Sequence, residues 1–408
     1  MLTARMGHVR GTRARTDCAA DLGGHVRILF TTVALPGHLF PLVPLAWACR
    51  ALGHEVMVAT TDNFLAEVAR AGLPVTSCGP ESGLRDLRSA AAVALDGDRH
   101  PALSMSDQRY AHGLAFARIA RRSLDGLRAL TGTWRPDVVV SERAELAGPI
   151  AAAALGVPSA ELHWGAAPLP EYRSAAAAEL AGELGDLGLD DLPDPGLLLN
   201  PWPPSVRGTY ADRHYTLRAV PYNGEARVPA WMLSAADRPR VCLTLGTVLP
   251  RLGRHGGAEF LLPLLDRLAG LGLEIVIAVD DEIAATWPRL PDAVRFAGRL
   301  PMSHALSTCA LSINHGGQGT ALTSLAAGTP QLLLPRFDDQ FDNADAVVKS
   351  GAGLRLLPEE ITATIVARRC AELLEDEAYR TAARGIAAEI AAQPSPVVAC
   401  RRLETLVA

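Results

Sequence analysis

The chain has 408 residues, 49% of them hydrophobic, and a formal net charge of −5 at pH 7. This length fits two domains of roughly 200 residues each, and the mild charge gives no sign of a nucleic-acid partner or an electrostatic membrane anchor. No uninterrupted apolar run reaches the roughly 18 residues that a membrane-spanning helix needs. The 7 cysteines lack CxxC spacing, which indicates neither a zinc site nor a disulfide framework. We therefore expect a cytoplasmic protein with no membrane partner.

The first half of the chain predicts alternating buried strands and helices. Residues 1–24 lack periodicity, and we expect a disordered tail there. Buried parallel strands are predicted from apolar, β-branched runs at 25–33, 54–59, 74–77, 137–141 and 159–163. Helices that end at glycines are predicted at 39–52 and 147–155, and residues 165–215 are expected to hold helices with loops. This order predicts a Rossmann-like domain over 25–218.

A second alternation follows a linker. The stretch 219–238 contains prolines and a glycine and separates the two halves. Strands of the second half are predicted at 241–245, 274–279, 294–297, 311–313 and 331–334. The second domain covers 239–392, and residues 393–408 form a last helix. Two successive Rossmann-like halves predict a cleft between domains, where ligands usually bind.

One segment, residues 314–344, carries most of the functional signal. A short apolar run leads into a turn that contains His315, Gly316, Gly317, Gly319 and Thr320. Glycines let the backbone approach a ligand, and the free N–H groups of the helix that follows form an anion site. Asp338, Asp339 and Gln340 come after the next strand and can exchange hydrogen bonds with hydroxyls. A phosphate-binding turn followed by residues that bind hydroxyls suits a sugar nucleotide. The turn alone would also fit an ordinary βαβ connection.

The same segment resembles the donor-binding signature of the family 1 (UGT-like) glycosyltransferases, specifically the bacterial antibiotic type. The residues shared with that signature are His315, Gly316, Gly317, Gly319, Thr320, Ala327, Gly328, Pro330, Gln331, Pro335, Asp339, Gln340 and Asn343. Asn314 departs from it, because relatives usually carry another histidine there. The stretches 36–56 and 220–224 are also typical of bacterial glycosyltransferases that act on secondary metabolites. Residues 220–224 and 394–396 are most similar to enzymes that decorate polyketide and enediyne aglycones.

This resemblance implies the GT-B architecture, an α/β fold in which two Rossmann-like domains face each other across a cleft. Domain 25–218 would bind the acceptor, domain 239–392 would bind the nucleotide sugar, and the helix in 393–408 would cross back to the first domain. The implied reaction is the inverting transfer of a deoxysugar from a dTDP- or UDP-sugar to a hydroxyl of a hydrophobic natural-product aglycone, during antibiotic biosynthesis. A homodimer and an auxiliary activator protein, which some relatives use, remain open.

Transfer needs a base that removes the proton of the acceptor hydroxyl. A neutral imidazole suits this task near pH 7, and His38 follows the first strand at its carboxyl end, in the context where relatives place the catalytic histidine. A carboxylate would orient this base. Glu142 follows another strand and matches the acidic position of the family, while Glu145 is the competing candidate; either could instead be a charge at a helix N-terminus. Trp164, at a further strand end, is a candidate for the acceptor pocket or for the core.

On the donor side, the resemblance implies that His315, the turn amides and Thr247 face the diphosphate. At the base-recognition position, Arg299 stands where relatives often carry an aromatic residue. A guanidinium can stack on a pyrimidine or point to solvent, and backbone groups of Leu300 could read the edge of the base.

Asp339 and Gln340 are expected to bind the sugar. We expect the reaction to need neither a metal nor a cofactor. Asp96 and Asp98 have the DxD spacing with which metal-dependent GT-A enzymes hold a cation against a diphosphate. They lie in a polar turn rather than at the end of a clear strand, and we interpret them as solvated.

Two alternative functions are compatible with the same fold. A catalytically idle GT-B protein, which binds sugar nucleotides or a partner, would be expected to lose His38 or His315, and both are present. A GT-B nucleotide-sugar epimerase would work without an acceptor. The presence of His38, and of Asp339 and Gln340 near the end of the donor-binding segment, argues against an epimerase.

Overall fold

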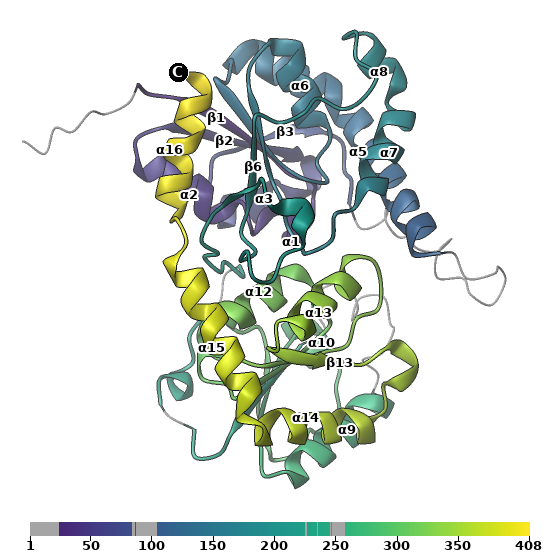
Figure 1. Cartoon of the computed structure of the whole chain (residues 1–408), viewed down its shortest axis with the longest axis vertical. Helices are drawn as coiled ribbons and strands as arrows, with labels where there is room; N and C mark the ends of the chain where they lie inside the picture. The colour runs from purple at the N-terminus through teal and green to yellow at the C-terminus, as the bar shows by residue number, and fades with distance from the viewer. Residues whose placement is uncertain are drawn as a thin grey trace, which may run out of the picture.

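Two α/β domains lie one above the other along the longest axis of the molecule (Figure 1). The structure is a computed structural model and describes residues 24–83, 86, 104–224, 227–234, 236–244, 246 and 258–408. Each domain is built around one sheet, with 7 strands in the first and 6 in the second. The predicted architecture of two Rossmann-like domains is therefore confirmed. The expected disordered tail lies outside the described residues, except for Gly24.

The N-terminal sheet has the strand order β3-β2-β1-β4-β5-β6-β7, and the paired strands run parallel. The strands are β1 (Arg27–Thr31), β2 (Glu55–Thr61), β3 (Val75–Gly79), β4 (Val138–Glu142), β5 (Ser159–Leu162), β6 (Leu197–Asn200) and β7 (Tyr215–Thr216). Strands β1 and β4 are buried apolar runs, as a parallel sheet covered on both faces requires. The strand order reverses between them, so a ligand site is expected at their carboxyl ends.

Helices cover both faces of this sheet. They are α1 (Pro36–Leu39), α2 (Val43–Ala51), α3 (Leu65–Arg70), α5 (Met105–Trp134), α6 (Ala147–Leu155), α7 (Pro170–Glu179) and α8 (Ala181–Gly185), with 3₁₀ turns at Asp62–Phe64, Thr209–Ala211 and, in the linker, Ala230–Leu233. The helix predicted over 39–52 is present as α2, but it begins later than expected, at Val43, and the short helix α1 precedes it. Pro44 fits the first turn of α2 because proline has no N–H to leave unpaired there. The expectation for 165–215 is incomplete, since β6 and β7 extend the sheet there.

The C-terminal sheet has the order β10-β9-β8-β11-β12-β13 and is also parallel. Its strands are β8 (Arg240–Leu243), β9 (Glu274–Ala278), β10 (Val294–Gly298), β11 (Leu311–Asn314), β12 (Gln331–Leu333) and β13 (Gly353–Arg355). Its helices are α9 (Ala258–Gly270), α10 (Asp281–Ala284), α11 (Met302–Ser307), α12 (Gln318–Ala326), α13 (Asp339–Lys349), α14 (Ala363–Glu375) and α15 (Glu377–Ala392), with a 3₁₀ turn at Pro358–Glu360. Here the strand order reverses between β8 and β11.

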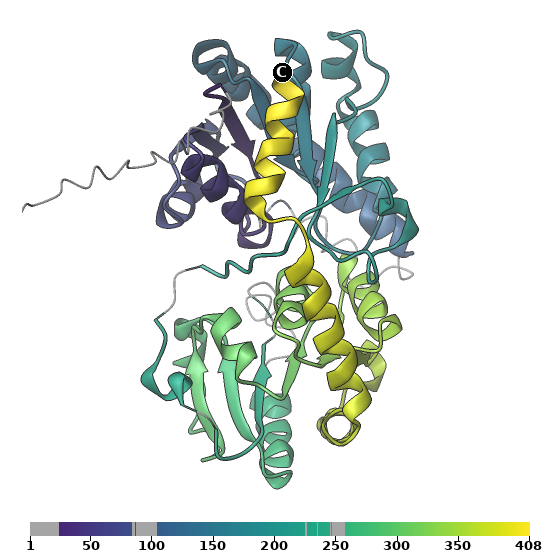
Figure 2. The same cartoon turned by 60° about the vertical axis from the view of Figure 1, so that its left-hand side comes forward.

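The last helix, α16 (Pro396–Val407), returns to the N-terminal domain. Figure 2 shows α15 against the C-terminal domain and α16 against the N-terminal one. The buried face of α16, including Cys400 and Leu403, belongs to the hydrophobic core that also contains β1. Cys400 is disulfide-bonded to Cys49 of α2, which corrects the expectation of no disulfide. The pairing could not be predicted because the two cysteines are 351 residues apart. Within the described residues, no helix is long and apolar enough to cross a bilayer.

Candidate active site between the two domains

A cavity of about 1130 Å³ lies between the domains. The N-terminal domain contributes the loops after β1, β2, β3 and β5 together with one face of α5. The C-terminal domain contributes the segments that follow β8, β9, β10, β11 and β12. The carboxyl ends of both parallel sheets therefore surround the same space, which is where ligands bind in such sheets.

His38 lines this cavity from α1, beside the carboxylate of Glu142. Its Nδ1 atom is 3.1 Å from Oε2 of Glu142, although it lies off the line that a hydrogen bond requires. The indole ring of Trp164 stands edge-on to the imidazole, with 4.9 Å between the ring centroids. His38, Glu142 and Trp164 come from the ends of β1, β4 and β5, which are adjacent in the sheet. The topology thus brings them together.

The carboxylate of Glu142 is fully buried and has several partners. Its Oε2 accepts hydrogen bonds from the Trp164 indole at 2.7 Å and from the backbone N–H of Ala144 at 2.9 Å. Burial alone would raise the pKa of Glu142, but His38, Trp164 and the Ala144 amide together hold it below its usual range. The carboxylate is therefore ionised at neutral pH beside an imidazole.

Glu145, the competing candidate, binds the N-terminus of helix α6 instead of His38. Its two carboxylate oxygens accept from the backbone N–H groups of Ala147 and Gly148 at 3.1 and 2.9 Å, which satisfies the N-terminus of α6. Burial raises the pKa of Glu145 to about 7. The geometry therefore separates the two candidates, because Glu142 contacts His38 and Glu145 caps a helix.

His315 follows β11 and faces the cavity from the opposite domain. Its ring fits between two glycines: a Cβ atom would lie 2.5 Å from Cε1 if added to Gly246 and 2.3 Å from Nε2 if added to Gly317. Burial lowers the pKa of His315 to about 4, so the ring is neutral at pH 7. Among the described residues, none forms a hydrogen bond with its Nδ1 atom. The ring can therefore offer a hydrogen bond to a ligand.

The turn before α12 and the first residues of α12 have a part that lines the cavity and a part that is buried. Gly317, Gly319 and Thr320 line the cavity. Gly316 lies beneath them with φ of 78°, and its N–H donates to Oδ1 of Asn314 at 2.8 Å. Gly316 thus shapes the turn, and its amide is already bonded. Asn314, the departure from the family signature, closes the turn from below.

Asp339 and Gln340 open α13 and both line the cavity. Oδ2 of Asp339 accepts from Asn343 at 2.8 Å, and burial followed by the neighbouring Asp338 carboxylate raises the pKa of Asp339. The Gln340 side-chain oxygen accepts from the backbone N–H of Arg336 at 3.0 Å. These contacts fix both side chains at the cavity wall.

The base-recognition candidates also line the cavity. Arg299 has a side chain 59% exposed and forms an ion pair with Asp280 at 3.2 Å, whereas Leu300 is buried. Thr247, and the DxD pair Asp96 and Asp98, lie outside the described residues.

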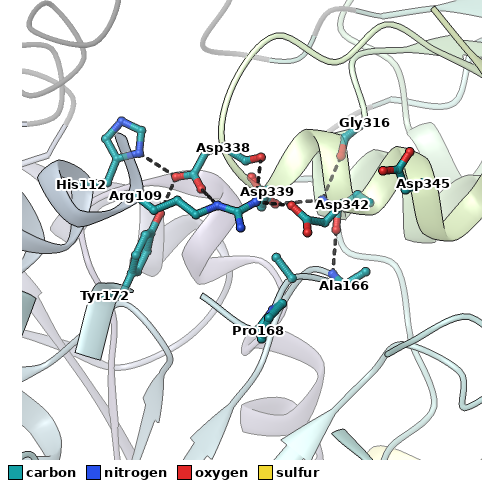
Figure 3. Close-up of polar contacts among 12 residues, drawn as sticks. Arg109, His112, Ala166, Pro168, Tyr172, Gly316, Asp338, Asp339, Asp342 and Asp345 are labelled. Carbon is teal, nitrogen blue, oxygen red and sulfur yellow. Dashed lines mark hydrogen bonds and ion pairs between the residues drawn. The ribbon is translucent and has the colours of Figure 1, made fainter. Parts of the chain in front are cut away.

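Three residues at the domain boundary were not singled out from the sequence. Arg109 and His112 of α5 and Tyr172 of α7 converge on Asp338, which precedes α13 (Figure 3). No local motif signals this contact, because the partners are 166 to 229 residues away from Asp338.

One described cluster has the spacing of metal ligands, and it lies outside the cavity. The ligand atoms of His54, Cys400 and Glu404 are within 4.8 Å of one another. They lie where α16 packs on the N-terminal domain, and the Cys400 sulfur is bonded to Cys49.

The fold and the cavity define a glycosyltransferase of the GT-B type: two parallel sheets face one cavity, with a His–Glu pair on one side and a histidine–glycine turn on the other. Two family models match the chain. They are described as the N-terminal and C-terminal domains of erythromycin biosynthesis protein CIII-like proteins, and they cover residues 47–246 and 263–406.

Relatives and solved structures agree with these models. The L-demethylnoviosyl transferase of Streptomyces niveus is 40% identical over 379 residues, which cover 93% of this chain and 97% of the relative. The glycosyltransferase SsfS6 of Streptomyces sp. SF2575, solved with thymidine diphosphate, has a TM-score of 0.80 at 35% identity and matches 93% of this chain and 100% of its own. The spinosyn rhamnosyltransferase SpnG, solved with spinosyn aglycone, has a TM-score of 0.80 at 32% identity, with coverages of 93% and 100%. The chain belongs to the EryCIII-like family of antibiotic glycosyltransferases.

Proposed function

We propose that this enzyme transfers a deoxysugar from a dTDP-sugar to a hydroxyl of a hydrophobic polyketide aglycone, with inversion at the anomeric carbon. The observation that carries the proposal is one cavity with His38 on one wall, backed by the buried carboxylate of Glu142, and His315 with its glycine turn on the other wall. The donor class is supported by thymidine diphosphate in the SsfS6 structure, and the acceptor class by spinosyn aglycone in SpnG.

On the acceptor side, His38 removes the proton of the hydroxyl as its oxygen attacks the anomeric carbon. The imidazolium that results is stabilised by the Glu142 carboxylate, whose Oε2 atom is 3.1 Å from Nδ1. A single displacement at the anomeric carbon by this acceptor oxygen inverts the configuration. Phe116 and Tyr172 line the same part of the cavity and offer apolar surface to an aglycone.

On the donor side, negative charge grows on the departing diphosphate. The neutral His315 ring and the N–H groups at the start of α12 are positioned donors for this charge. Asp339 and Gln340 hold hydroxyls of the sugar, while Arg299 and the backbone of Leu300 lie in reach of the base.

The proposed reaction uses neither a metal nor a cofactor, because the His315 turn supplies the stabilisation of the leaving group. We also propose that the enzyme works in the cytoplasm. Assays with the single purified protein, with chelator present, would test the need for a metal or an auxiliary activator. Size-exclusion chromatography would test for a homodimer.

The central experiment compares the parent with His38→Ala on dTDP-sugars and a panel of polyketide aglycones. Loss of the base should lower kcat by roughly 10²- to 10⁴-fold. His25→Ala is the matched control, since His25 is exposed and precedes β1 at the opposite edge of the sheet. Near-parental transfer by His38→Ala would overturn the mechanism. Binding of dTDP without any turnover would favour the idle protein, and conversion of the donor without acceptor would favour the epimerase.

A further inference from the structure

Asp338 lies where the C-terminal domain touches the N-terminal domain at the rim of the cavity (Figure 3). Its Oδ2 atom accepts hydrogen bonds from the Tyr172 hydroxyl at 2.5 Å and from Nδ1 of His112 at 2.6 Å. Nε of Arg109 is 3.5 Å from Oδ1. One carboxylate of the donor-binding domain is therefore held by three side chains of the other domain.

This contact is buried and charged. The side chain of Asp338 is 6% exposed, and those of His112 and Arg109 are 8% and 11% exposed. Burial alone would raise the pKa of Asp338, but His112, Tyr172 and Arg109 lower it, so the carboxylate stays ionised. A buried charge without its partners is strongly unfavourable, and the contact therefore exists only while the two domains are together.

The backbone at Asp338 also depends on this contact. Its φ of 52° and ψ of −128° lie in a region that residues other than glycine rarely adopt. Such a conformation persists only when the surroundings hold it in place. Here the surroundings include the three side chains from α5 and α7.

The two residues that follow Asp338 are the proposed sugar ligands. Asp339 and Gln340 form the first turn of α13, so the path of the chain through Asp338 sets the direction of their side chains. The same end of α13 has two more contacts with the N-terminal domain. Arg109 pairs with Asp342, and the backbone N–H of Ala166 donates to Oδ1 of Asn343 at 2.7 Å. The N-terminal domain thus aligns the start of the helix.

We propose that Asp338 is a positioning residue that turns Asp339 and Gln340 onto the donor sugar only when the domains are closed. This inference rests on the proposed glycosyl transfer. Asp339 and Gln340 then bind the sugar only in the closed arrangement of the domains, which is also the arrangement that brings His38 opposite the donor. The nucleoside diphosphate is held by other residues, so its binding does not depend on Asp338.

The test uses Asp338→Asn and Tyr172→Phe, singly and combined. Asparagine tolerates a positive φ, so the first change removes the charge without adding backbone strain. Each single change should lower kcat/KM for the dTDP-sugar by roughly 10- to 100-fold, as expected for a lost hydrogen bond to a charged group. Affinity for dTDP alone should stay within about twofold, since dTDP has no sugar for the aligned residues to hold. The double variant should lose less than the product of the two single losses, because both changes remove one interaction.

Asp345→Asn is the matched control. Asp345 lies on the same helix, is exposed, and pairs with Arg355 of its own domain, so its loss should leave kcat/KM unchanged. Equal losses of dTDP and dTDP-sugar affinity, or multiplicative losses in the double variant, would overturn the proposal.

Hydrogen exchange without substrate supplies a second readout. Exchange at residues 337–343 should rise in Asp338→Asn and in Tyr172→Phe but not in Asp345→Asn; unchanged exchange in both would contradict the positioning role. If the parent protein transfers no sugar, the proposed function fails, while the exchange result still decides whether Asp338 holds the domains together. Should Asp338→Asn not fold, Tyr172→Phe carries both measurements.

Discussion

The proposed base depends on a side chain that does not touch the reacting atoms. The Trp164 indole donates a hydrogen bond to Glu142 at 2.7 Å and stands edge-on to His38. The same ring therefore holds the carboxylate in place and restricts the orientation of the imidazole. From the sequence, Trp164 is a candidate for the acceptor pocket or the core. The structure places it at the cavity and adds the bond to Glu142, which depends on the adjacency of β4 and β5 and cannot be inferred from spacing.

We predict that Trp164→Phe lowers kcat about tenfold while the KM of the dTDP-sugar changes little. The phenyl ring keeps the contact with His38, but Glu142 loses a hydrogen bond to a charged group, and such a bond contributes about 1.5–3 kcal/mol. Trp47→Phe is the control, because the Trp47 indole donates at 2.8 Å to the Ala71 carbonyl, outside the cavity. Steady-state kinetics on both variants would decide. Equal effects at the two tryptophans would contradict this role.

Local motifs explain which residues could be predicted from the sequence and which could not. His315, Gly317, Gly319 and Thr320 lie within six positions, so their chemistry is visible in the chain itself. The partners of Asp338 lie up to 229 residues away on α5 and α7, on helices with no distinctive pattern. Their convergence is a product of domain packing.

The same difference appears among the elements. Strand β4 could be predicted because its run of valines is continuous and fully buried. Strand β7 has only two residues, Tyr215 and Thr216, which are too few for a period to be seen. Helix α16 could be placed by its prolines, but the bond of Cys400 to Cys49 depends on how it packs against α2.

We predict that reduction destabilises the enzyme through α16. The Cys49–Cys400 bond joins residues 351 positions apart, and removal of a native disulfide typically costs about 2–4 kcal/mol. Reductant should therefore lower the melting temperature of the parent protein. The same treatment should leave Cys49→Ser/Cys400→Ser unaffected, since it has no bond to lose. A parent melting curve that does not respond to reductant would show that this bond does not stabilise the enzyme.

At the scale of the whole molecule, the two reversals of strand order face each other. His38 follows β1, Glu142 is the last residue of β4, and His315 follows β11 beside β8. The carboxyl ends of the two sheets therefore face one cavity. The cleft could be predicted from two successive βα alternations. How closely the domains approach depends on side chains such as Gln318, which donates to the Gly37 carbonyl at 3.1 Å across the boundary.

Gly165 offers a way to separate domain approach from the stability of either domain. It has φ of 76°, and a Cβ atom there would lie 3.2 Å from Oδ1 of Asn343 and 3.3 Å from Oδ2 of Asp339, so Gly165→Ala inserts a methyl group between the domains. Gly156 has φ of 74° at the end of α6 with no atom near its Cβ position, and Gly156→Ala imposes the same backbone strain without that wedge.

Both variants should lose about 1–2 kcal/mol of stability to the left-handed conformation. Only Gly165→Ala should also lower kcat/KM for transfer, by roughly tenfold or more, since displacement of α13 by a fraction of an ångström misaligns the groups that hold the donor. Thermal melting and steady-state kinetics on the pair would measure the two effects independently. The two variants share the same backbone strain and differ only in the methyl group placed between the domains. If both kept the parental kcat/KM at an equal loss of stability, the close approach of Gly165 to α13 would not matter for transfer.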